Sequence, residues 1–463
     1  MVQTKLNTGL GGRLLAMRDQ FRSGATRTYA FRKEQLLNLK RFLLKYEEEI
    51  NEALFLDLKK SKEETWATET GLLMSEINTA LKHLHQWMKP KRVRTNLLNL
   101  PSSSFILYEP LGVVMIIGPW NYPLQLLLIP LVGAIAAGNC AVLKGSEFSP
   151  ATSAVIRKII EKAFPEQYVL YVEGEGHVIV PELMSNFVFD HIFYTGSAAT
   201  GKLIYKRAAE NLIPVTLELG GKSPCVVESD ANLGVAARRI AMTKFSNAGQ
   251  MCIAPDYLLV HQNVMDEFVS TLTATVKQFF GDPPNSNEYG KIINEKQFDR
   301  LINFLNQGEI IFGGKYDKSK LFIEPTIFAN VSLESDVMKE EIFGPILPLI
   351  GFSKAAEAKA IIEENPNPLA FYVYTSSARK EKFWLENISF GGGCVNNSSW
   401  HFTNHHLPFG GRGMSGIGRY HGRYTFETFS HAKSIMKTPT WFDPKLRYPP
   451  LKGKLEILKK LIR

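Results

Sequence analysis

The chain has 463 residues, more than one hydrophobic core usually supports, so we expect two or three domains. Hydrophobic residues at 45%, charged residues at 21% and a mean hydropathy of -0.09 exclude a disordered chain and a polytopic membrane protein. The net charge of +9 gathers at the end of the chain, where residues 432–463 hold nine Lys or Arg against two acids, a net +7. Because a nucleic-acid binder carries basic residues across a whole domain, with aromatics between them, no nucleic-acid partner is expected.

Cysteine and histidine usage gives no sign of a disulfide framework or a metal site. The four cysteines are widely spaced and form no Cys-x-x-Cys pattern: Cys140, Cys225, Cys252 and Cys394. His401, His405 and His406 cluster, but no cysteine or carboxylate completes a ligand set, so no metal is expected. Reduced thiols, and an N-terminus without the apolar stretch of a secretory signal, favour a cytoplasmic protein.

The N-terminal part of the chain is expected to be helical and then extended. Residues 10–90 alternate apolar and charged positions at helical spacing, as in residues 31–44. Residues 93–108 instead carry polar and apolar residues at strand-like spacing around Pro101. We therefore predict amphipathic helices followed by a strand-forming segment.

The segment from Pro110 to Leu143 contains no charged residue and is long enough to span a membrane. It is interrupted by residues 118–123, by Pro130 and by residues 138–139. These interruptions divide it into a strand, a loop, a helix and a strand, each short enough to lie in a buried α/β core. We favour that interpretation over a membrane span.

Between residues 112 and 211, apolar runs alternate with helical stretches, which predicts a mainly parallel sheet with helices on both faces. The strand at residues 139–144 delivers Lys144 and then Glu147 into a loop, at the edge where open α/β sheets bind ligands. Residues 193–201 are typical of a strand turning into a helix whose free N–H groups face a pyrophosphate. Their glycines do not form the usual Gly-x-Gly-x-x-Gly fingerprint, so this signal is weak alone.

After Glu218 a second series of strands and helices begins, which implies a second doubly wound domain. Residues 410–416 are rich in glycine and superficially resemble another phosphate loop. No hydrophobic strand leads into them, so we interpret them as a tight packing turn.

Two reactive side chains of the second region form a pair. Cys252 lies among small and amide residues in the stretch 245–256, and it follows Glu218 of the Glu-Leu-Gly-Gly-Lys stretch by 34 positions. A thiol and a carboxylate from another segment suit a reaction that forms a thioester and then hydrolyses it. The pairing resembles that of the aldehyde dehydrogenases. The resemblance runs from Arg13 to about Lys437 and is greatest to the class 3 branch of shorter, dimeric enzymes.

The resemblance implies an α/β fold with two doubly wound, Rossmann-like domains and a small β arm for oligomerisation. The implied parts are residues 1–91 and 109–211 (NAD(P)-binding domain), 212–406 (catalytic domain), 92–108 and 407–440 (dimerisation arm and return to the first domain) and 441–463 (basic C-terminal tail). A homodimer is expected from the resemblance alone.

The resemblance also implies which residues bind a cofactor. Lys144 and Glu147 would address the adenosine ribose, although Gly145 stands where the family usually has proline, which makes this loop less rigid. A carboxylate at the ribose disfavours a 2′-phosphate, so NAD is expected to be preferred, with NADP possible. The other implied cofactor residues are Trp120, Gly196, Ser197, Gly201, Gly220, Glu341 and Phe343. For Phe343, simple core packing is the alternative.

Asn121 follows a buried strand, and its side-chain N–H can stabilise the oxyanion formed when a thiolate attacks an aldehyde. In the implied cycle Cys252 adds to the aldehyde, hydride leaves for the nicotinamide, and Glu218 activates the water that hydrolyses the thioester. The thiol pKa must fall below its free value of about 8.5, and helix N-terminal N–H groups or cofactor charge are expected to lower it. The implied substrates are medium- or long-chain aliphatic and aromatic aldehydes. Candidate apolar wall residues are Trp120, Tyr122, Trp400 and Phe402.

Other interpretations compete with this one. A thiol hydrolase that used Cys252 without a redox step would need a histidine partner, and no histidine lies near either catalytic segment in sequence. A non-catalytic binding protein would need none of Asn121, Glu218 and Cys252. For the tail, a solvated segment is favoured over a basic amphipathic helix at residues 455–463 that touches an anionic membrane.

Overall fold

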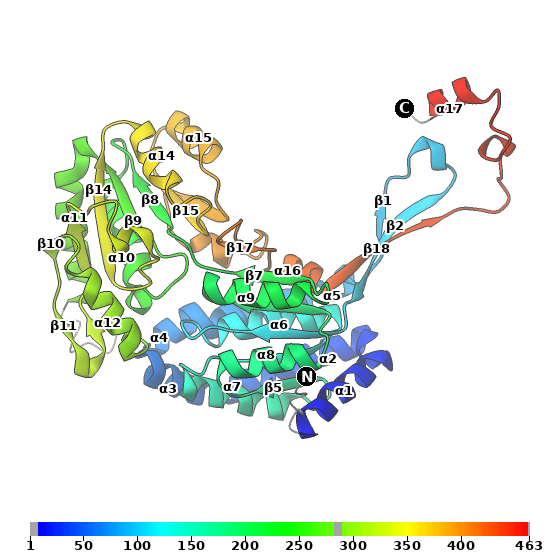
Figure 1. The fold of residues 1–463 in the computed structure, drawn as a ribbon, viewed down its shortest axis with the longest axis horizontal. Helices are drawn as coiled ribbons and strands as arrows, with labels where there is room; N and C mark the ends of the chain where they lie inside the picture. Colours follow the sequence, from blue (N-terminus) through cyan, green and yellow to red (C-terminus); the bar gives the residue numbers. More distant parts are fainter. Residues whose placement is uncertain (1–7, 282–288, 462–463) are drawn as a thin grey trace.

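The computed structural model describes residues 8–281 and 289–461, which form two lobes and a projecting arm (Figure 1). The chain begins with the predicted run of helices. Their bounds are α1 (Thr8–Arg22), α2 (Tyr29–Lys45), α3 (Glu47–Leu58), α4 (Lys62–Thr65), a turn of π-helix η2 (Trp66–Thr70) and α5 (Gly71–Trp87). The helical prediction for residues 10–90 is confirmed.

The sheet of the first lobe has the strand order β17-β7-β6-β3-β4-β5. Its parallel strands are β3 (Val113–Ile117), β4 (Cys140–Lys144), β5 (Val169–Val172), β6 (His191–Thr195) and β7 (Val215–Glu218), and β17 (Gly416–Ile417) is antiparallel to β7. The order reverses between β3 and β6, and open α/β sheets bind ligands beside such a switch point. Asn121 follows β3 and Gly196 follows β6, so both lie at this point.

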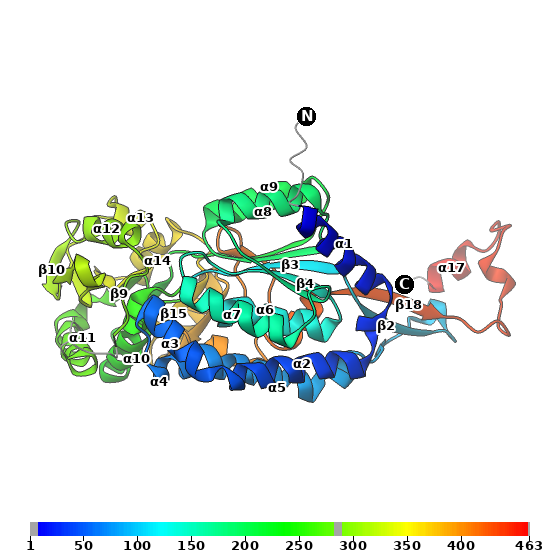
Figure 2. The same ribbon diagram turned by 90° about the horizontal axis from the view of Figure 1, so that it is seen from below.

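Helices cover both faces of the first sheet, as predicted. They are α6 (Gln125–Ala137), α7 (Pro150–Ala163), α8 (Gly176–Asn186) and α9 (Ala198–Ala209). Figure 2 shows α8 and α9 on one face and α6 and α7 on the other, with α2, α3 and α5 below α6 and α7. Every residue of α6 is buried, as are all residues of β3 and β4. The uncharged segment is thus a strand, loop, helix and strand of the core, and no described helix is long and apolar enough to cross a membrane.

The second lobe contains a sheet of order β10-β13-β14-β9-β8-β15-β16, parallel except for the edge strand β10. Its strands are β8 (Pro224–Val227), β9 (Tyr257–His261), β10 (Glu309–Phe312), β13 (Thr326–Ala329), β14 (Ile346–Phe352), β15 (Ala370–Tyr374) and β16 (Gly392–Val395). A short hairpin, β11 (Tyr316–Asp317) with β12 (Phe322–Ile323), lies outside it. The second doubly wound domain is therefore confirmed.

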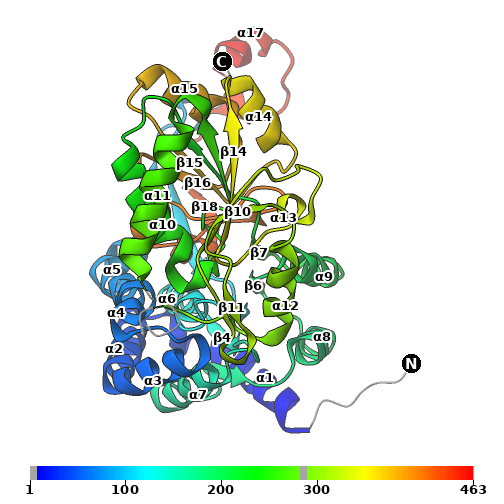
Figure 3. The same ribbon diagram turned by 90° about the vertical axis from the view of Figure 1, so that its left-hand side faces the viewer.

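The helices of the second lobe are α10 (Leu233–Phe245), α11 (Met265–Phe280), α12 (Glu295–Phe304), α13 (Asp336–Lys339), α14 (Ala355–Glu363) and α15 (Ala378–Asn387). In Figure 3, α10 and α11 cover one face of the sheet and α14 the other. A hydrophobic cluster around the fully buried Trp384 fills this lobe.

The arm is a three-stranded antiparallel sheet of order β1-β2-β18 that projects from the lobes (Figure 1). Its strands are β1 (Lys91–Val93), β2 (Ser103–Pro110) and β18 (Ser430–Lys437), and α16 (Arg423–Thr428) packs on α6 just before β18. The tail contains α17 (Leu455–Leu461), so the helix considered for residues 455–463 exists over those seven residues; residues 462–463 lie outside the described chain. The predicted α/β class, with two Rossmann-like sheets and a β arm, is confirmed.

Candidate active site

The loop that carries Cys252 connects α10 to β9 and is held in a specific shape by its small and amide residues. Asn247 has a left-handed backbone with φ of 49°. At Gly249 an added Cβ would lie 2.2 Å from the carbonyl oxygen of Gly344, so only glycine fits there. Gln250 Nε2 donates back to the carbonyl of Asn247 at 2.9 Å. These residues therefore shape the loop and present the thiol.

Glu218 is the last residue of β7, where the chain leaves the first sheet for the second. Its carboxyl group is buried and accepts no hydrogen bond from any residue in the described part of the chain. Burial raises the pKa of this carboxyl well above its usual value. A buried carboxyl without a protein partner is left to bond water or a substrate group, as a general base requires.

Asn121 lies in the loop between β3 and α6, and its side chain is buried. Its Nδ2 donates to the carbonyl of Gln250 at 3.0 Å, which fixes the amide against the loop of Cys252. The amide carries two N–H groups, so one donor is left for an oxygen atom bound near the thiol. This geometry agrees with the predicted role in stabilising an oxyanion.

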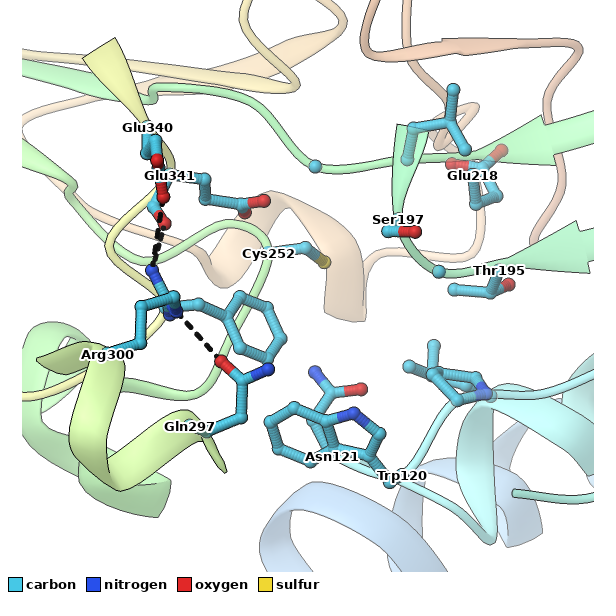
Figure 4. A pocket seen from close by; sticks show the side chains of 16 residues that line it. Trp120, Asn121, Thr195, Ser197, Glu218, Cys252, Gln297, Arg300, Glu340 and Glu341 are labelled. Atoms are coloured by element: carbon cyan, nitrogen blue, oxygen red, sulfur yellow. Dashed lines mark hydrogen bonds and ion pairs between the residues drawn. The ribbon is translucent and has the colours of Figure 1, made fainter. Parts of the chain in front are cut away.

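A first cavity of about 420 Å³ brings together most of the predicted site residues. Its walls include predicted residues from both lobes: Trp120, Asn121, Gly196, Ser197, Glu218, Gly220, Cys252, Glu341 and Phe343. Figure 4 shows the Cys252 thiol between Glu341 on one side and Glu218 on the other, with the Asn121 amide facing it. Residues from five separate stretches of sequence therefore meet around one thiol.

The turn after β6 leads into α9, and the first residues of this turn line the first cavity. Ser197 is the N-cap of α9 and accepts from the N–H of Thr200 at 3.3 Å. Backbone N–H groups at such a helix start favour an anion. Gly201 lies in the first turn of α9 and outside the cavity lining, where an added Cβ would lie 2.7 Å from Leu219. Its smallness therefore lets α9 pack closely on the segment after β7.

The backbone at Gly220 passes close to the carboxylate of Glu341. An added Cβ at Gly220 would lie 1.8 Å from Glu341 Oε2. Burial, with a contribution from nearby Asp256, raises the pKa of Glu341 to about 8. Phe343 lines the same wall and meets Trp120 edge-on, with ring centres 5.3 Å apart. Phe343 is therefore not only a packing residue, because its ring faces the cavity.

Lys144 and Glu147 lie at the carboxyl end of β4, outside the lining of the first cavity. Glu147 accepts from Lys144 Nζ at 3.0 Å and from the N–H of Gly176 at 2.8 Å, so its position is fixed by hydrogen bonds despite Gly145. An added Cβ at Gly145 would lie 2.1 Å from the hydroxyl of Tyr171. The glycine is thus explained by the tyrosine that packs over it.

A second cavity of about 360 Å³ meets the first at the reactive pair. The two share Leu126, Thr195, Glu218, Leu219 and Cys252. The second cavity is mainly apolar, and its lining contains the predicted wall residues Tyr122, Trp400 and Phe402 together with Leu72, Met242, Ile253, Phe409 and Tyr420. Trp120, also predicted as an apolar wall residue, lines the first cavity instead.

The expectation that a helix N-terminus lowers the pKa of Cys252 is wrong. Cys252 follows a short 3-10 turn, and no helix begins there in the described chain. Burial raises the pKa of the thiol, and the carboxyl groups of Glu341 and Glu218 raise it further; N–H groups of the loop lower it only in part. The protein's own groups therefore favour the neutral thiol, which leaves only the predicted positive charge of a cofactor to lower the pKa.

Sequence reasoning missed several cavity residues, of which Gln297 and Arg300 carry the most polar groups. Both lie on α12. Arg300 donates to the carbonyl oxygens of Glu341 at 3.1 Å and Ile342 at 2.6 Å, and its Nε donates to Gln297 at 2.9 Å. These bonds hold the Glu341 segment against the cavity. Nothing in the sequence around them signalled this, because they come from an ordinary amphipathic helix.

Histidines near the reactive pair bear on the hydrolase alternative. His421 lines the second cavity, and burial lowers its pKa to about 3. His401 Nδ1 lies 3.6 Å from Cys394 Sγ. Between Cys252 and any histidine there is no hydrogen bond in the described residues. The thiol therefore lacks the imidazole partner that a cysteine hydrolase uses.

Comparisons with known proteins identify the family of the chain. The family model described as "Aldehyde dehydrogenase family" matches residues 14–435. A 4,4'-diaponeurosporen-aldehyde dehydrogenase from Staphylococcus aureus is 44% identical over 442 residues, covering 95% of this chain and 96% of the relative. Aldehyde dehydrogenase family 3 member B1 from Homo sapiens is 42% identical over 450 residues, covering 95% and 94%.

Solved structures give the same result. The substrate-bound state of Staphylococcus aureus AldH superposes with a TM-score of 0.95 at 43% identity, covering 98% of this chain and 99% of that one. An indole-3-acetaldehyde dehydrogenase in complex with NAD+ superposes with a TM-score of 0.84 at 28% identity, covering 92% and 88%. The chain therefore belongs to the aldehyde dehydrogenase family, in its class 3 branch, and is an oxidoreductase that converts aldehydes to acids.

Proposed function

We propose that the protein oxidises medium- or long-chain aliphatic and aromatic aldehydes to carboxylic acids through a thioester on Cys252, which water activated by Glu218 then hydrolyses. One observation carries the proposal: the only acid and thiol common to the two cavities within the described residues are Glu218 and Cys252. A reaction that needs a cofactor on one side and an apolar substrate on the other has to occur where both sides meet.

The residues of the first cavity fit a nicotinamide dinucleotide. The start of α9 presents N–H groups for a phosphate, and the close approach of Gly220 to Glu341 leaves a cradle that any larger side chain would fill. Glu341 and Phe343 would hold the nicotinamide end, and Lys144 and Glu147 the adenosine ribose. A bound nicotinamide would supply the acceptor for the hydride that leaves the substrate. NAD is proposed as the preferred cofactor, with NADP as a second; solved relatives carry one or the other.

The chemistry proposed for the protein's own groups is as follows. Cys252 Sγ forms a bond to the aldehyde carbon after the thiol loses its proton. The aldehyde oxygen, which becomes negative, accepts hydrogen bonds from the side-chain N–H of Asn121 and from the backbone N–H of Cys252. Hydride loss from that carbon leaves the thioester. Glu218 then takes a proton from water, the water oxygen attacks the thioester carbon, and Cys252 leaves as a thiolate with the acid released.

The second cavity supports apolar aldehydes as substrates. Aromatic and aliphatic side chains dominate its walls, and the transfer of apolar surface from water to such walls contributes roughly 25 cal/mol per Å². Nonanal should therefore exceed acetaldehyde in kcat/KM. Better turnover of acetaldehyde would contradict the assignment of this cavity to long apolar substrates.

A homodimer formed through the arm is part of the proposal. The projecting sheet leaves side chains such as Val93 and Met436 largely exposed in one chain. A partner subunit would cover such a surface. Light scattering would measure the mass of the full-length protein and of a variant that lacks residues 430–461. A monomer in the full-length protein would contradict this part of the proposal.

The proposed reaction is tested by following NADH absorbance during oxidation of nonanal. Wild-type protein should turn over, Cys252→Ala should form no NADH, and Glu218→Gln should stall after an initial burst because the thioester forms but is not hydrolysed. If no aldehyde yields NADH or NADPH, the redox function is wrong. Hydrolysis of an ester such as p-nitrophenyl acetate without any nicotinamide, together with no NADH or NADPH from any aldehyde, would instead favour the hydrolase.

A further inference from the structure

A buried ion pair lies behind the loop that carries Asn121. Lys60 lies between α3 and α4, and Glu69 lies in the π-helical turn η2. Lys60 Nζ donates to Glu69 Oε1 at 2.6 Å, and both side chains are completely buried. Neither residue lines either cavity, so the pair acts from behind the site. A π-helical turn is itself uncommon and is often found at functional sites.

The two partners hold the middle and the C-terminal end of the Asn121 loop. Lys60 Nζ donates to the carbonyl of Asn121 at 3.0 Å. Glu69 Oε2 accepts from the N–H groups of Leu124 at 3.1 Å and Gln125 at 3.0 Å, where α6 begins. Because a buried charge without such partners is costly, the pair favours the one loop conformation that supplies them. The loop is thereby anchored to the N-terminal region at its middle and at its C-terminal end.

The carbonyl of Asn121, to which Lys60 donates, also joins the Asn121 loop to the loop of Cys252. Asn247 Nδ2 donates to the carbonyl of Asn121 at 2.9 Å, and Asn121 Nδ2 donates to the carbonyl of Gln250 at 3.0 Å. Asn247 and Gln250 both belong to the loop that presents Cys252. The place of the free Asn121 N–H relative to the thiol therefore depends on where the ion pair holds the Asn121 backbone.

We propose that Lys60 and Glu69 are positioning residues for aldehyde oxidation, because their ion pair aligns the free amide N–H of Asn121 with the oxyanion that forms beside Cys252. This inference rests on the proposed function, since it takes the oxyanion role of Asn121 from it. Alignment of this kind matters because a misplacement of about 1 Å can cost about 100-fold in rate.

The test is the double variant Lys60→Met/Glu69→Gln. Met fills the space of the lysine stem, and Gln keeps an acceptor for the N–H groups of Leu124 and Gln125, so neither member of the pair is left charged without the other. With nonanal and NAD, we expect kcat to fall about 10- to 100-fold. The KM for NAD and the rate at which iodoacetamide alkylates Cys252, followed by peptide mass spectrometry, should stay unchanged.

A second variant covers the case in which the double variant does not fold. Lys60→Arg keeps a positive charge beside Glu69, but its larger planar head displaces the Asn121 carbonyl. We expect a fall in kcat of about tenfold, again with unchanged alkylation of Cys252. Full kcat in a folded Lys60→Arg protein would count against the proposal.

A matched control neutralises an ion pair at the opposite end of the same sheet. Arg18 of α1 pairs with Asp190, which precedes β6 and accepts from the N–H of Val113 at 2.7 Å. Arg18→Met/Asp190→Asn should leave kcat unchanged. If this control lowers kcat as much as Lys60→Met/Glu69→Gln does, the loss reflects general destabilisation and the proposal fails.

Combination with Asn121→Ala separates positioning from other effects. If the ion pair acts through Asn121, its neutralisation should add no further loss of kcat to Asn121→Ala. Three results would each overturn the inference. They are losses of kcat that multiply when Lys60→Met/Glu69→Gln is combined with Asn121→Ala, slower alkylation of Cys252, and unchanged kcat in the folded Lys60→Met/Glu69→Gln protein. Full activity of Asn121→Ala alone would instead show that the oxyanion role in the proposed function is wrong.

Discussion

The two cavities that meet at Cys252 are built in different ways. The first takes its shape from the turns that follow β3, β6 and β7 and from carboxyl groups such as Glu341. The second is enclosed by side chains of η2, α5, α10 and the segment around residues 399–421, which lie far apart in sequence. Turns at strand ends thus form much of the polar side, whereas side chains from helices and from the segment around residues 399–421 form most of the apolar side.

This difference separates what each side contributes to function. The polar side depends on close backbone approaches, where one added methyl group at Gly220 would force the Glu341 carboxylate to move. The apolar side depends on the size of many side chains, each of which contributes a modest part of the binding free energy. Changes to the shared pair should therefore have the largest effects, changes to the polar side intermediate ones, and changes to the apolar walls the smallest.

The largest effect is expected at the shared thiol. Cys252→Ala should lower NAD-dependent oxidation of nonanal by at least about 1000-fold, because loss of a nucleophile is not replaced by its neighbours. Steady-state NADH formation measures this. Cys394→Ala is the control, since Cys394 on β16 lines neither cavity and should keep its activity. Substantial turnover by Cys252→Ala would remove the thioester from the mechanism.

The pH dependence follows from the buried groups that both cavities share. Burial raises the pKa of both Cys252 and Glu218, and both must lose a proton to act. Each is mostly protonated below its raised pKa, so activity should increase with pH. We expect kcat/KM for nonanal to rise by up to about tenfold per unit between about pH 7 and pH 9. A profile that falls over this range would mean that another group limits the reaction.

Gly220→Ala tests the polar side. The added Cβ would lie 1.8 Å from the Glu341 carboxylate, so Glu341 must move and cofactor binding should weaken. We expect the KM for NAD to rise about tenfold, which is about 1.4 kcal/mol. Gly351→Ala is the matched control, because its added Cβ would make an ordinary contact of 3.4 Å with Met265. Equal KM values for both variants would contradict the role of Gly220.

Phe402→Ala tests the apolar side and should have the smallest effect. Removal of this ring should lower the preference for nonanal over acetaldehyde, measured as the ratio of kcat/KM values, by about threefold, since many other side chains also line this cavity. Acetaldehyde turnover should change little. Trp441→Ala, which removes a ring from the exposed tail, should leave the ratio unchanged. If the tail variant shifts the ratio and Phe402→Ala does not, the substrate approaches from elsewhere.

Much of this organisation could be predicted from the sequence, because it is encoded locally. The strand and helix periods gave the two doubly wound domains, and the short stretches around Asn121, Glu218 and Cys252 gave their roles through the resemblance to a known family. The interruptions at residues 118–123 and 138–139 correctly distinguished a buried core from a membrane span, whereas Pro130, also predicted as an interruption, lies inside α6 and does not end it. Patterns of this kind can be identified in a sequence because each depends on residues that are neighbours in the chain.

Features that depend on tertiary packing could not be predicted. Lys60 and Glu69 have the composition of a solvated helix surface, and only the folded chain buries them together. Gly145 is explained by Tyr171, a residue of the neighbouring strand β5. Of the two sources expected to lower the pKa of Cys252, a helix N-terminus or cofactor charge, the helix does not exist there, and burial raises the pKa instead. In each case the deciding partner comes from a distant segment.

The most direct test of the central claim is to trap the covalent intermediate. Glu218→Gln would be mixed with NAD and nonanal, quenched in acid and examined by intact-protein mass spectrometry, followed by peptide mapping. The mechanism predicts a mass increase of one nonanoyl group on the peptide that contains Cys252, together with one NADH per site. NADH formation without any acyl group on Cys252 would contradict the thioester mechanism.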